Sequence, residues 1–250
     1  MENRKIGIVL AGGGARGFAH LGVLKALEEK GIKPDYISAV SAGSIIGAFI
    51  ASGKNPDQVM EIMQESNFFD YAKVLMPKNG LMSLENLHKN LKEQLEENTI
   101  SELKIPLYIA ASNLATGKIR YFAEGDLCQI VQASSSIPIL FSPVEIDGDL
   151  YVDGGLLDNL PVEPLKDKCD IIIAVNIMPI EETRDLNNLI EIAVRTFQLS
   201  INRNQEEIKK TVDLFIQPEG LEEYNILDTK HVDTLFELGY EHTKKLKIEI

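Results

Sequence analysis

The chain has 250 residues, of which 44% are hydrophobic; this is enough to bury a sizeable core, and the lack of a Ser/Pro/Gly-rich linker predicts one domain over residues 1–250. The net charge of −13 opposes contact with a phosphate backbone, so we do not expect nucleic-acid binding. Two cysteines are too few for a disulfide framework, and no run approaches the roughly 18 apolar residues of a membrane span, so we expect a cytoplasmic protein that contacts membranes only peripherally.

Short apolar runs alternate with helical patterns along the chain, which predicts an α/β fold with a mostly parallel sheet. The first run, Ile6–Ala11, indicates a buried strand and is too short for a secretion signal. A helix over Arg16–Lys30 follows and ends at Gly31. A second strand at Tyr36–Val40 then leads into the apolar, and therefore buried, helix Ala42–Ser52.

The next helix begins at Asn55, which caps its first turn; Pro56 suits the first helical position and Gln58 completes a capping box. A leucine-patterned helix begins at Ser83. The remaining predicted elements are, in chain order, strands at Pro106–Asn113 and Lys118–Ala123, a helix at Leu127–Ser135, a hairpin of Val144–Ile146 and Leu150–Val152 around Asp147-Gly148, a strand at Asp170–Ile177, a helix at Asp185–Lys210, a strand at Leu214–Gln217 and a helix at Thr229–Lys245.

Four glycines occupy six positions between the first strand and the first helix, in Gly12-Gly13-Gly14-Ala15-Arg16-Gly17. Such a loop leaves N–H groups uncovered at a helix N-terminus and binds negative charge. That charge can be a dinucleotide pyrophosphate, because the spacing matches G-x-G-x-x-G, or the oxyanion of acyl transfer. A dinucleotide site also needs an acidic residue at the far end of the second strand, where the sequence has Ser41, whereas Asp35 lies at the opposite end. The oxyanion interpretation is therefore favoured.

Arg16 stands in the first turn of the helix, where a positive charge is unfavourable against the helix dipole. A surface arginine is the simplest interpretation. A position beside a pocket that stabilises negative charge explains the residue better.

Ser41 lies at the turn between the second strand and the apolar helix, within Ala39-Val40-Ser41-Ala42-Gly43. The small residues on both sides permit the tight turn of a nucleophile elbow, which projects the serine Oγ at the carboxyl edge of a sheet. An ordinary helix N-cap would explain this serine taken alone. Because the glycine loop ends the neighbouring strand at the same edge, we interpret Ser41 as a nucleophile.

A nucleophilic serine needs a group that takes its proton. The histidines all lie in predicted helices and not in loops at strand ends: His20, His88, His231 and His242. Asp153 follows the predicted strand Leu150–Val152 and precedes Gly154-Gly155, so a carboxylate stands at a strand end. A turn aspartate would explain it equally well without the other two motifs.

Taken together, these motifs resemble the patatin-like phospholipase family, in its bacterial branch. The resemblance covers about the first two-thirds of the chain in the family's order, and its blocks are Gly12–Gly17, Phe18–Gly22, Ala39–Gly43, Ala133–Pro138 with Phe141 and Pro143, Asp153–Gly155 and Asn159–Pro161.

The resemblance implies a three-layer α/β/α fold and hydrolysis of acyl esters of phospholipids or other lipids, with no metal and no cofactor. Carried over by position, it implies Ser41 as nucleophile and Asp153 as general base in a dyad without histidine. It also implies that an oxyanion is stabilised by Gly12, Gly13, Gly14 and Arg16.

The sequence departs from the family pattern at Ala39, which replaces the first glycine of the elbow and brings a Cβ near the serine. Two alternatives stay open. One is a histidine-dependent hydrolase that uses His231 or His242. The other is a lipid-sensing or adaptor protein that kept the fold without turnover, which Ala39 favours.

An apolar stretch from Phe68 to Met82 lies between two predicted helices. Core packing and a lid that admits acyl chains explain it about equally well.

Overall fold

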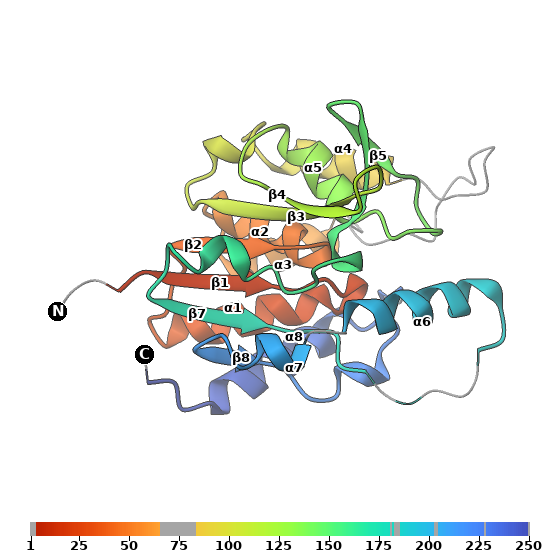
Figure 1. Ribbon diagram of the computed structural model, residues 1–250. Helices are drawn as coiled ribbons and strands as arrows, with labels where there is room; N and C mark the ends of the chain where they lie inside the picture. The colour runs from red at the N-terminus through yellow and green to blue at the C-terminus, as the bar shows by residue number, and fades with distance from the viewer. Residues whose placement is uncertain are drawn as a thin grey trace.

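The computed structural model describes residues 4–65, 84–180, 182, 186–202, 205–227 and 229–249. The strands of this described part form one eight-stranded sheet through the centre of the molecule (Figure 1). They are β1 (Ile6–Leu10), β2 (Tyr36–Ala39), β3 (Leu107–Asn113), β4 (Lys118–Phe122), β5 (Val144–Ile146), β6 (Asp149–Asp153), β7 (Ile171–Val175) and β8 (Leu214–Ile216).

The sheet has the order β5-β6-β3-β2-β1-β7-β8, and β4 also pairs with β3. The run from β3 through β2, β1 and β7 to β8 is parallel, whereas β4, β5 and β6 make antiparallel pairs. Every residue of β7 is buried, as expected for a parallel strand that is covered on both faces. The predicted α/β fold with a mostly parallel sheet is confirmed.

Along β3, two strands follow one another on the same edge. β2 pairs with the first part of β3, Leu107–Ile109, and β6 pairs with the last part, Ala111–Asn113. Because β4 pairs with residues of both parts, it occupies the other edge, and β2 and β6 must share the first one. β2 leaves this edge just before Ser41, and β6 ends on it at Asp153. Backbone pairing thus brings two distant segments of the chain together.

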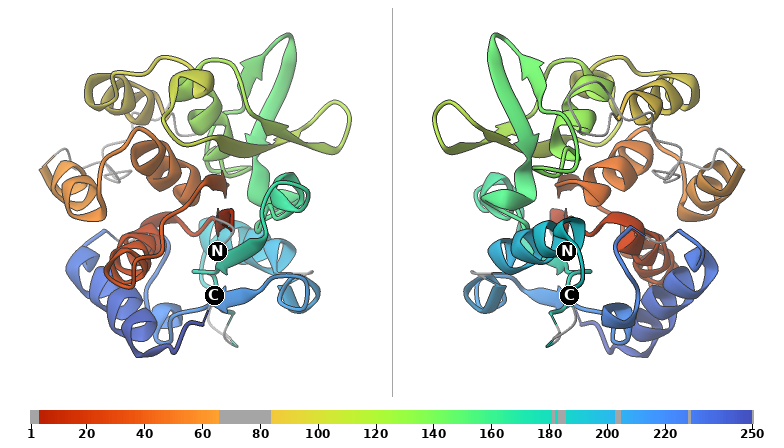
Figure 2. Two further views of the ribbon diagram at one scale, coloured as in Figure 1. Left: turned by 90° about the vertical axis from the view of Figure 1, so that its left-hand side faces the viewer. Right: turned by 90° about the vertical axis from the view of Figure 1, so that its right-hand side faces the viewer.

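Helices lie on both faces of the sheet. Figure 2 shows α1, α2, α3 and α8 on one side and α6 and α7 on the other. The helices are α1 (Phe18–Glu29), α2 (Ala42–Ala51), α3 (Pro56–Glu65), α4 (Glu85–Gln94), α5 (Leu127–Ser134), α6 (Leu189–Ile201), α7 (Gln205–Ile208) and α8 (Val232–Lys245). In the described part of the chain, no helix is both long enough and apolar enough to cross a bilayer.

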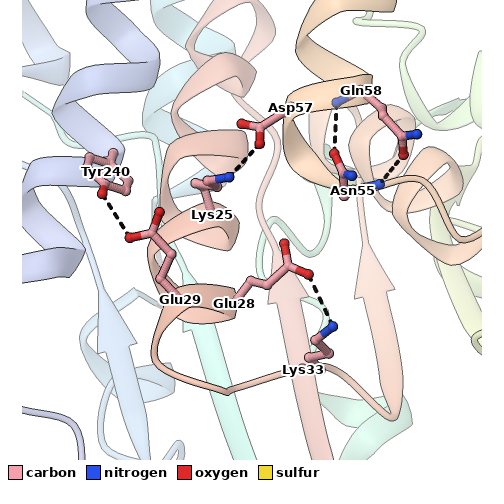
Figure 3. Close-up of polar contacts among 8 residues, drawn as sticks. All are labelled: Lys25, Glu28, Glu29, Lys33, Asn55, Asp57, Gln58 and Tyr240. Atoms are coloured by element: carbon pink, nitrogen blue, oxygen red, sulfur yellow. Dashed lines mark hydrogen bonds and ion pairs between the residues drawn. The ribbon is translucent and has the colours of Figure 1, made fainter.

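Helix α1 is held tightly between its neighbours. Gly22 and Gly239 let α1 and α8 approach closely, because a Cβ on Gly22 would lie 2.0 Å from the Phe236 carbonyl oxygen. Figure 3 shows two polar contacts that add to this packing, a salt bridge from Lys25 to Asp57 on α3 and a hydrogen bond from Tyr240 on α8 to Glu29.

Two local predictions are confirmed in detail. Asn55 and Gln58 exchange side-chain to backbone hydrogen bonds of 2.9 Å each, which is the predicted capping box (Figure 3). β5 and β6 form the predicted hairpin, and Asp147 and Gly148 both have positive φ, as a two-residue turn requires.

The helix predicted over Asp185–Lys210 is wrong in its extent. α6 begins only at Leu189, because Asn188 is extended and its side chain caps the helix by accepting a hydrogen bond of 3.0 Å from Glu191 N. The segment Gln205–Ile208 forms the separate short helix α7. The predicted first helix also differs, since a 3₁₀ turn over Gly14–Gly17 precedes α1. The apolar stretch from Phe68 to Met82 lies outside the described residues.

Candidate active site

Ser41 lies in a strained turn between β2 and α2. Its φ of 52° and ψ of −127° are rare for a residue with a side chain and are characteristic of a nucleophile elbow. Ser134 Oγ holds the turn by accepting a hydrogen bond of 2.9 Å from Ser41 N, and Ser134 in turn donates to the Ala110 carbonyl. A Cβ on Gly43 would lie 2.2 Å from the Leu10 carbonyl oxygen, so only glycine fits where α2 crosses β1.

Ala39, the departure from the elbow pattern, is accommodated by a second glycine. A Cβ placed on Gly47 of α2 would lie 3.3 Å from the Ala39 Cβ, so the methyl group of Ala39 occupies space that a residue larger than glycine at position 47 would fill. The alanine is fully buried. Gly47 therefore leaves room for the Ala39 methyl group on the side of α2.

Asp153, at the end of β6, is fully buried. Its Oδ1 accepts a hydrogen bond of 2.8 Å from Gly155 N. Burial raises the pKa of Asp153 to about 7, and interactions with the Ser41 hydroxyl and the Gly155 amide only partly oppose this rise. The carboxyl group therefore titrates near neutral pH, where an ordinary aspartate is fully ionised.

The Ser41 hydroxyl faces the carboxyl group of Asp153 closely enough to lower its pKa. Asp153 Oδ2 nevertheless accepts no hydrogen bond of ordinary length and angle from the described part of the chain. Contacts between catalytic groups are often longer before a substrate binds. Oδ2 is thus buried, faces no competing donor among the described residues, and is the oxygen left to receive a proton.

The amides of the glycine loop differ in whether they already have a partner. Gly12 N donates a 3.2 Å hydrogen bond to Asn159 Oδ1, and Ala15 N donates one of 2.8 Å to the Ile226 carbonyl. Within the described residues, the N–H groups of Gly13 and Gly14 donate no hydrogen bond. Gly14 has a φ of 57°, and a Cβ there would lie 2.2 Å from Ile226 O, so the loop requires this glycine. Among the described residues, the amides of Gly13 and Gly14 thus remain without a hydrogen-bond acceptor, which makes them the candidate oxyanion donors of the loop.

His20 supports the start of this loop and is a weak base. Its Nε2 donates a 2.8 Å hydrogen bond to the Ala11 carbonyl oxygen. Complete burial lowers the pKa of His20 to about 4, so the ring is neutral at pH 7. His231 and His242 belong to the N-terminus and the body of α8, and no histidine contributes to the pKa of Asp153.

Arg16 is buried and bonded to backbone. Only 4% of it is exposed, and its guanidinium donates to the carbonyl oxygens of Tyr224 at 2.8 Å, Glu222 at 3.2 Å and Pro179 at 3.4 Å. These contacts tie the start of α1 to the loops that follow β7 and β8.

Two residues of the site could not be assigned a role from the sequence. Ser134 orients the elbow, and Asn159 bonds the glycine loop, from which it is 147 residues away along the chain. The only sequence signal for them was their place in the blocks Ala133–Pro138 and Asn159–Pro161. Turn chemistry explained Asn159 adequately there.

A single family profile covers all parts of this site. The profile described as patatin-like phospholipase matches residues 8–166, which include Ser41, Asp153, Asn159 and the glycine loop. The chain belongs to the patatin-like phospholipase family.

Relatives within this family come from animals, fungi and bacteria. A patatin-like phospholipase domain-containing protein of Caenorhabditis elegans is 30% identical over 98% of this chain, and a lysophospholipase of Aspergillus niger is 28% identical over 98% of it. An NTE family protein of Mycobacterium bovis is 32% identical over 69% of the chain and 49% of its own length. The chain spans only 21% and 18% of the nematode and fungal proteins. These relatives do not single out a bacterial branch.

Solved structures share the fold. VipD from Legionella pneumophila aligns with 96% of this chain and 66% of its own, with a TM-score of 0.53 and 15% identity. A human GIVD cytosolic phospholipase A2, bound to a fluorophosphonate, aligns with 96% of this chain and 57% of its own, with a TM-score of 0.51 and 12% identity. At these identities the likeness concerns the fold alone.

Proposed function

We propose that this patatin-like protein is a serine hydrolase of lipid acyl esters, with Ser41 as nucleophile and Asp153 as general base. The observation that carries the proposal is the buried Asp153 carboxyl group, with a pKa of about 7 and the Ser41 hydroxyl facing it. A base that titrates near the working pH combines the correct protonation state with a useful driving force for proton transfer. All described strands belong to one sheet, which supports a single catalytic domain over residues 1–250.

In the first step, Asp153 Oδ2 takes the proton of Ser41, and the serine Oγ bonds to the ester carbonyl carbon. The negative charge that develops on the carbonyl oxygen is stabilised by the N–H groups of Gly13 and Gly14. The C–O bond to the alcohol then breaks, and the alcohol leaves with the proton from Asp153. Water attacks the acyl-enzyme with Asp153 again as base, which releases the fatty acid and restores the Ser41 hydroxyl.

Gly12 and Arg16 contribute to this site indirectly. The N–H of Gly12 already bonds Asn159, and the guanidinium of Arg16 bonds three backbone carbonyls. We assign Gly12 to the path of the loop, where a Cβ would lie 2.9 Å from the Ser41 Cβ. Arg16 anchors the 3₁₀ turn Gly14–Gly17, which connects the glycine loop to α1.

Lipids with a single acyl chain are the first substrates to test. The relative from Aspergillus niger that carries the name lysophospholipase aligns with 98% of this chain.

Contact with a lipid surface would come from α6. Figure 1 shows this helix beyond the carboxyl ends of β1 and β7, the edge at which the elbow and the glycine loop lie. Leu189, Ile192 and Leu199 lie on one side of α6 and are 76%, 46% and 51% exposed. These three residues, the exposed stripe of α6, form an uncharged apolar surface suited to peripheral contact with lipid.

The test combines hydrolysis of lysophospholipids with labelling by a fluorophosphonate probe. Ser41→Ala should lose at least about 10³-fold in turnover and all labelling. Asp153→Asn should lose about 10²–10⁴-fold. Ser52→Ala is the matched control, since Ser52 is a buried serine at the other end of α2 whose hydroxyl bonds the Phe49 carbonyl. Full activity in folded Ser41→Ala would refute the proposal.

A lipid-sensing or adaptor protein is the alternative function. Ala39 is its support in the sequence, and the room that Gly47 leaves for the Ala39 methyl group weakens that support. Folded wild-type protein that binds lipid vesicles but neither reacts with the fluorophosphonate probe nor releases fatty acid would establish the alternative.

A further inference from the structure

Asn159 lies between the two loops of the candidate active site. A Cβ placed on Gly12, in the glycine loop, would lie 2.7 Å from Asn159 Oδ1. A Cβ placed on Gly155, in the loop after Asp153, would lie 2.8 Å from the same oxygen. Asn159 Oδ1 therefore packs against Gly12 in one loop and Gly155 in the other. A side chain at either glycine would collide with this oxygen.

The Asn159 side chain contacts both polar groups of Gly12. Oδ1 accepts a hydrogen bond from Gly12 N at 3.2 Å, and Nδ2 reaches the Gly12 carbonyl oxygen at 3.5 Å. An amide side chain can bond a peptide group in this way because it carries one acceptor and donors side by side. The pairing occupies the Gly12 N–H, whereas the next two amides of the loop donate no hydrogen bond within the described part of the chain.

Asn159 is also close to the general base. Gly155 N donates to Asp153 Oδ1, and a Cβ on Gly155 would lie 3.0 Å from that oxygen and 2.8 Å from Asn159 Oδ1. The two side-chain oxygens thus border the same face of Gly155. Asn159 is buried, with 7% of it exposed, so water screens little of any charge placed there.

From these contacts we propose that Asn159 is a positioning residue that joins the glycine loop to the Asp153 loop, so that the oxyanion donors and the proton acceptor keep a fixed separation. The proposal rests on the proposed hydrolase function. It assigns to Asn159 no contact with the substrate, only control of where Gly13, Gly14 and Asp153 lie with respect to each other.

A neutral asparagine suits position 159 better than a negatively charged aspartate would. Aspartate has almost the same shape and keeps the Oδ1 acceptor, but it lacks the Nδ2 donor and carries a charge. A second carboxylate in this buried position would repel the ionised form of Asp153 and share its titration. A neutral amide joins the loops without disturbing the protonation of the base.

The experiment compares Asn159→Ala and Asn159→Asp with Asn113→Ala in lysophospholipid hydrolysis, with kcat and KM measured separately from pH 5 to 9. Asn113 is the matched control: it is exposed to the same 7%, and its side chain also bonds backbone amides, but those amides belong to the β3–β4 turn. Thermal melting of each variant reports folding.

Asn159→Ala should lower kcat about 10²-fold with KM changed less than about threefold, because misplaced groups weaken the transition state more than substrate binding. Its activity midpoint should stay at that of wild type. Asn159→Asp should move the midpoint of the pH profile up by about one unit or more. Asn113→Ala should lower the melting temperature but retain the wild-type kcat and midpoint.

Two results separate the proposals. If folded Ser41→Ala keeps full activity, the hydrolase function itself fails. If Ser41→Ala is inactive while both Asn159 variants match Asn113→Ala in kcat and midpoint, only the role of Asn159 is overturned. Should Asn159→Asp not fold, Asn159→Ala decides alone, since a change confined to KM or to the melting temperature contradicts the positioning role.

Discussion

Replacement of Asp153 by asparagine should stabilise the protein while it removes activity. Burial raises the pKa of Asp153 from an ordinary value of 3.8 to about 7, so the folded state holds this proton more tightly than the unfolded chain does. At neutral and higher pH, folding must therefore keep a carboxylate in an unfavourable environment. The asparagine side chain of the variant would retain an oxygen that accepts from Gly155 N and would carry no charge.

The sign and size follow from proton linkage. Between pH 4 and 7 the native state binds more protons at Asp153 than the unfolded state, so this group lowers stability as the pH rises, by up to about 1.4 kcal/mol per pH unit. The loss is complete above the folded pKa. A pKa displacement of about three units corresponds to about 4 kcal/mol. The advantage of Asp153→Asn should grow from under ~2 kcal/mol at pH 5 to about 4 kcal/mol above pH 8.

Urea unfolding of wild type and Asp153→Asn at each pH from 5 to 9 measures this difference. Groups that titrate in both proteins, His20 among them, cancel in the subtraction. The reasoning is refuted if the difference in unfolding free energy stays constant within about 0.5 kcal/mol over this range, because a constant difference means that the Asp153 pKa is alike in the folded and unfolded states.

Four further outcomes are expected. The kcat/KM of wild type should rise with pH to a plateau with a midpoint near pH 7, the pKa of Asp153; a midpoint near pH 4 would contradict an elevated pKa. Ala39→Gly should change kcat/KM less than about threefold, because the Ala39 Cβ already has room opposite Gly47; a tenfold gain would show that the alanine hinders the serine. Wild type should lose stability as the pH falls from 6.5 to 4, because the unfolded chain takes up a proton at His20 that the folded state, with its lowered pKa, does not. The variant His20→Gln keeps an N–H donor but cannot titrate, so its loss over this range should be smaller by about 3 kcal/mol. Equal acid sensitivity of the two proteins in urea unfolding argues against a neutral buried ring. Serine at all three positions of the exposed stripe of α6 should lower hydrolysis of lipid vesicles about tenfold and leave hydrolysis of a short soluble ester within about twofold; equal losses on both substrates exclude an interfacial role.

The parts that could be predicted from the sequence are those decided within a few residues. The Asn55–Gln58 capping box and the Asp147-Gly148 turn each depend on local hydrogen bonds or local φ preferences, and both are present. The serine turn belongs to the same group, since a serine that projects from a strand end in so tight a turn needs small neighbours. The start of α6 is an exception, because its cap is equally local but was not predicted: Asn188 is extended, and its side chain accepts a hydrogen bond from Glu191 N.

The meeting of Ser41 with Asp153 depends on long-range pairing that periodicity does not encode. It requires that β6 pair with β3 on the edge that β2 has just left, and nothing in the sequence of β6 specifies that partner. The role of Asn159 depends on the same register, because its amide reaches Gly12 only after the two loops are brought together. Sequence motifs select the candidate residues, whereas the strand pairing of the sheet decides which of them lie close together.

The same physical effect gives the histidine and the aspartate of this site opposite roles. Burial disfavours the charged form of any side chain, so it lowers the pKa of His20 to about 4 and raises that of Asp153 to about 7. The histidine thereby becomes a neutral hydrogen-bond donor that supports the glycine loop, and the aspartate acquires the titration range that histidine has in water. In the proposed mechanism, Asp153 needs no third residue to orient it, because the sheet register and the Gly155 amide already hold its carboxyl group. Both groups are fully buried, so the sign of the charge that each can carry decides the direction of its pKa shift and makes Asp153 the better candidate to accept the proton of Ser41.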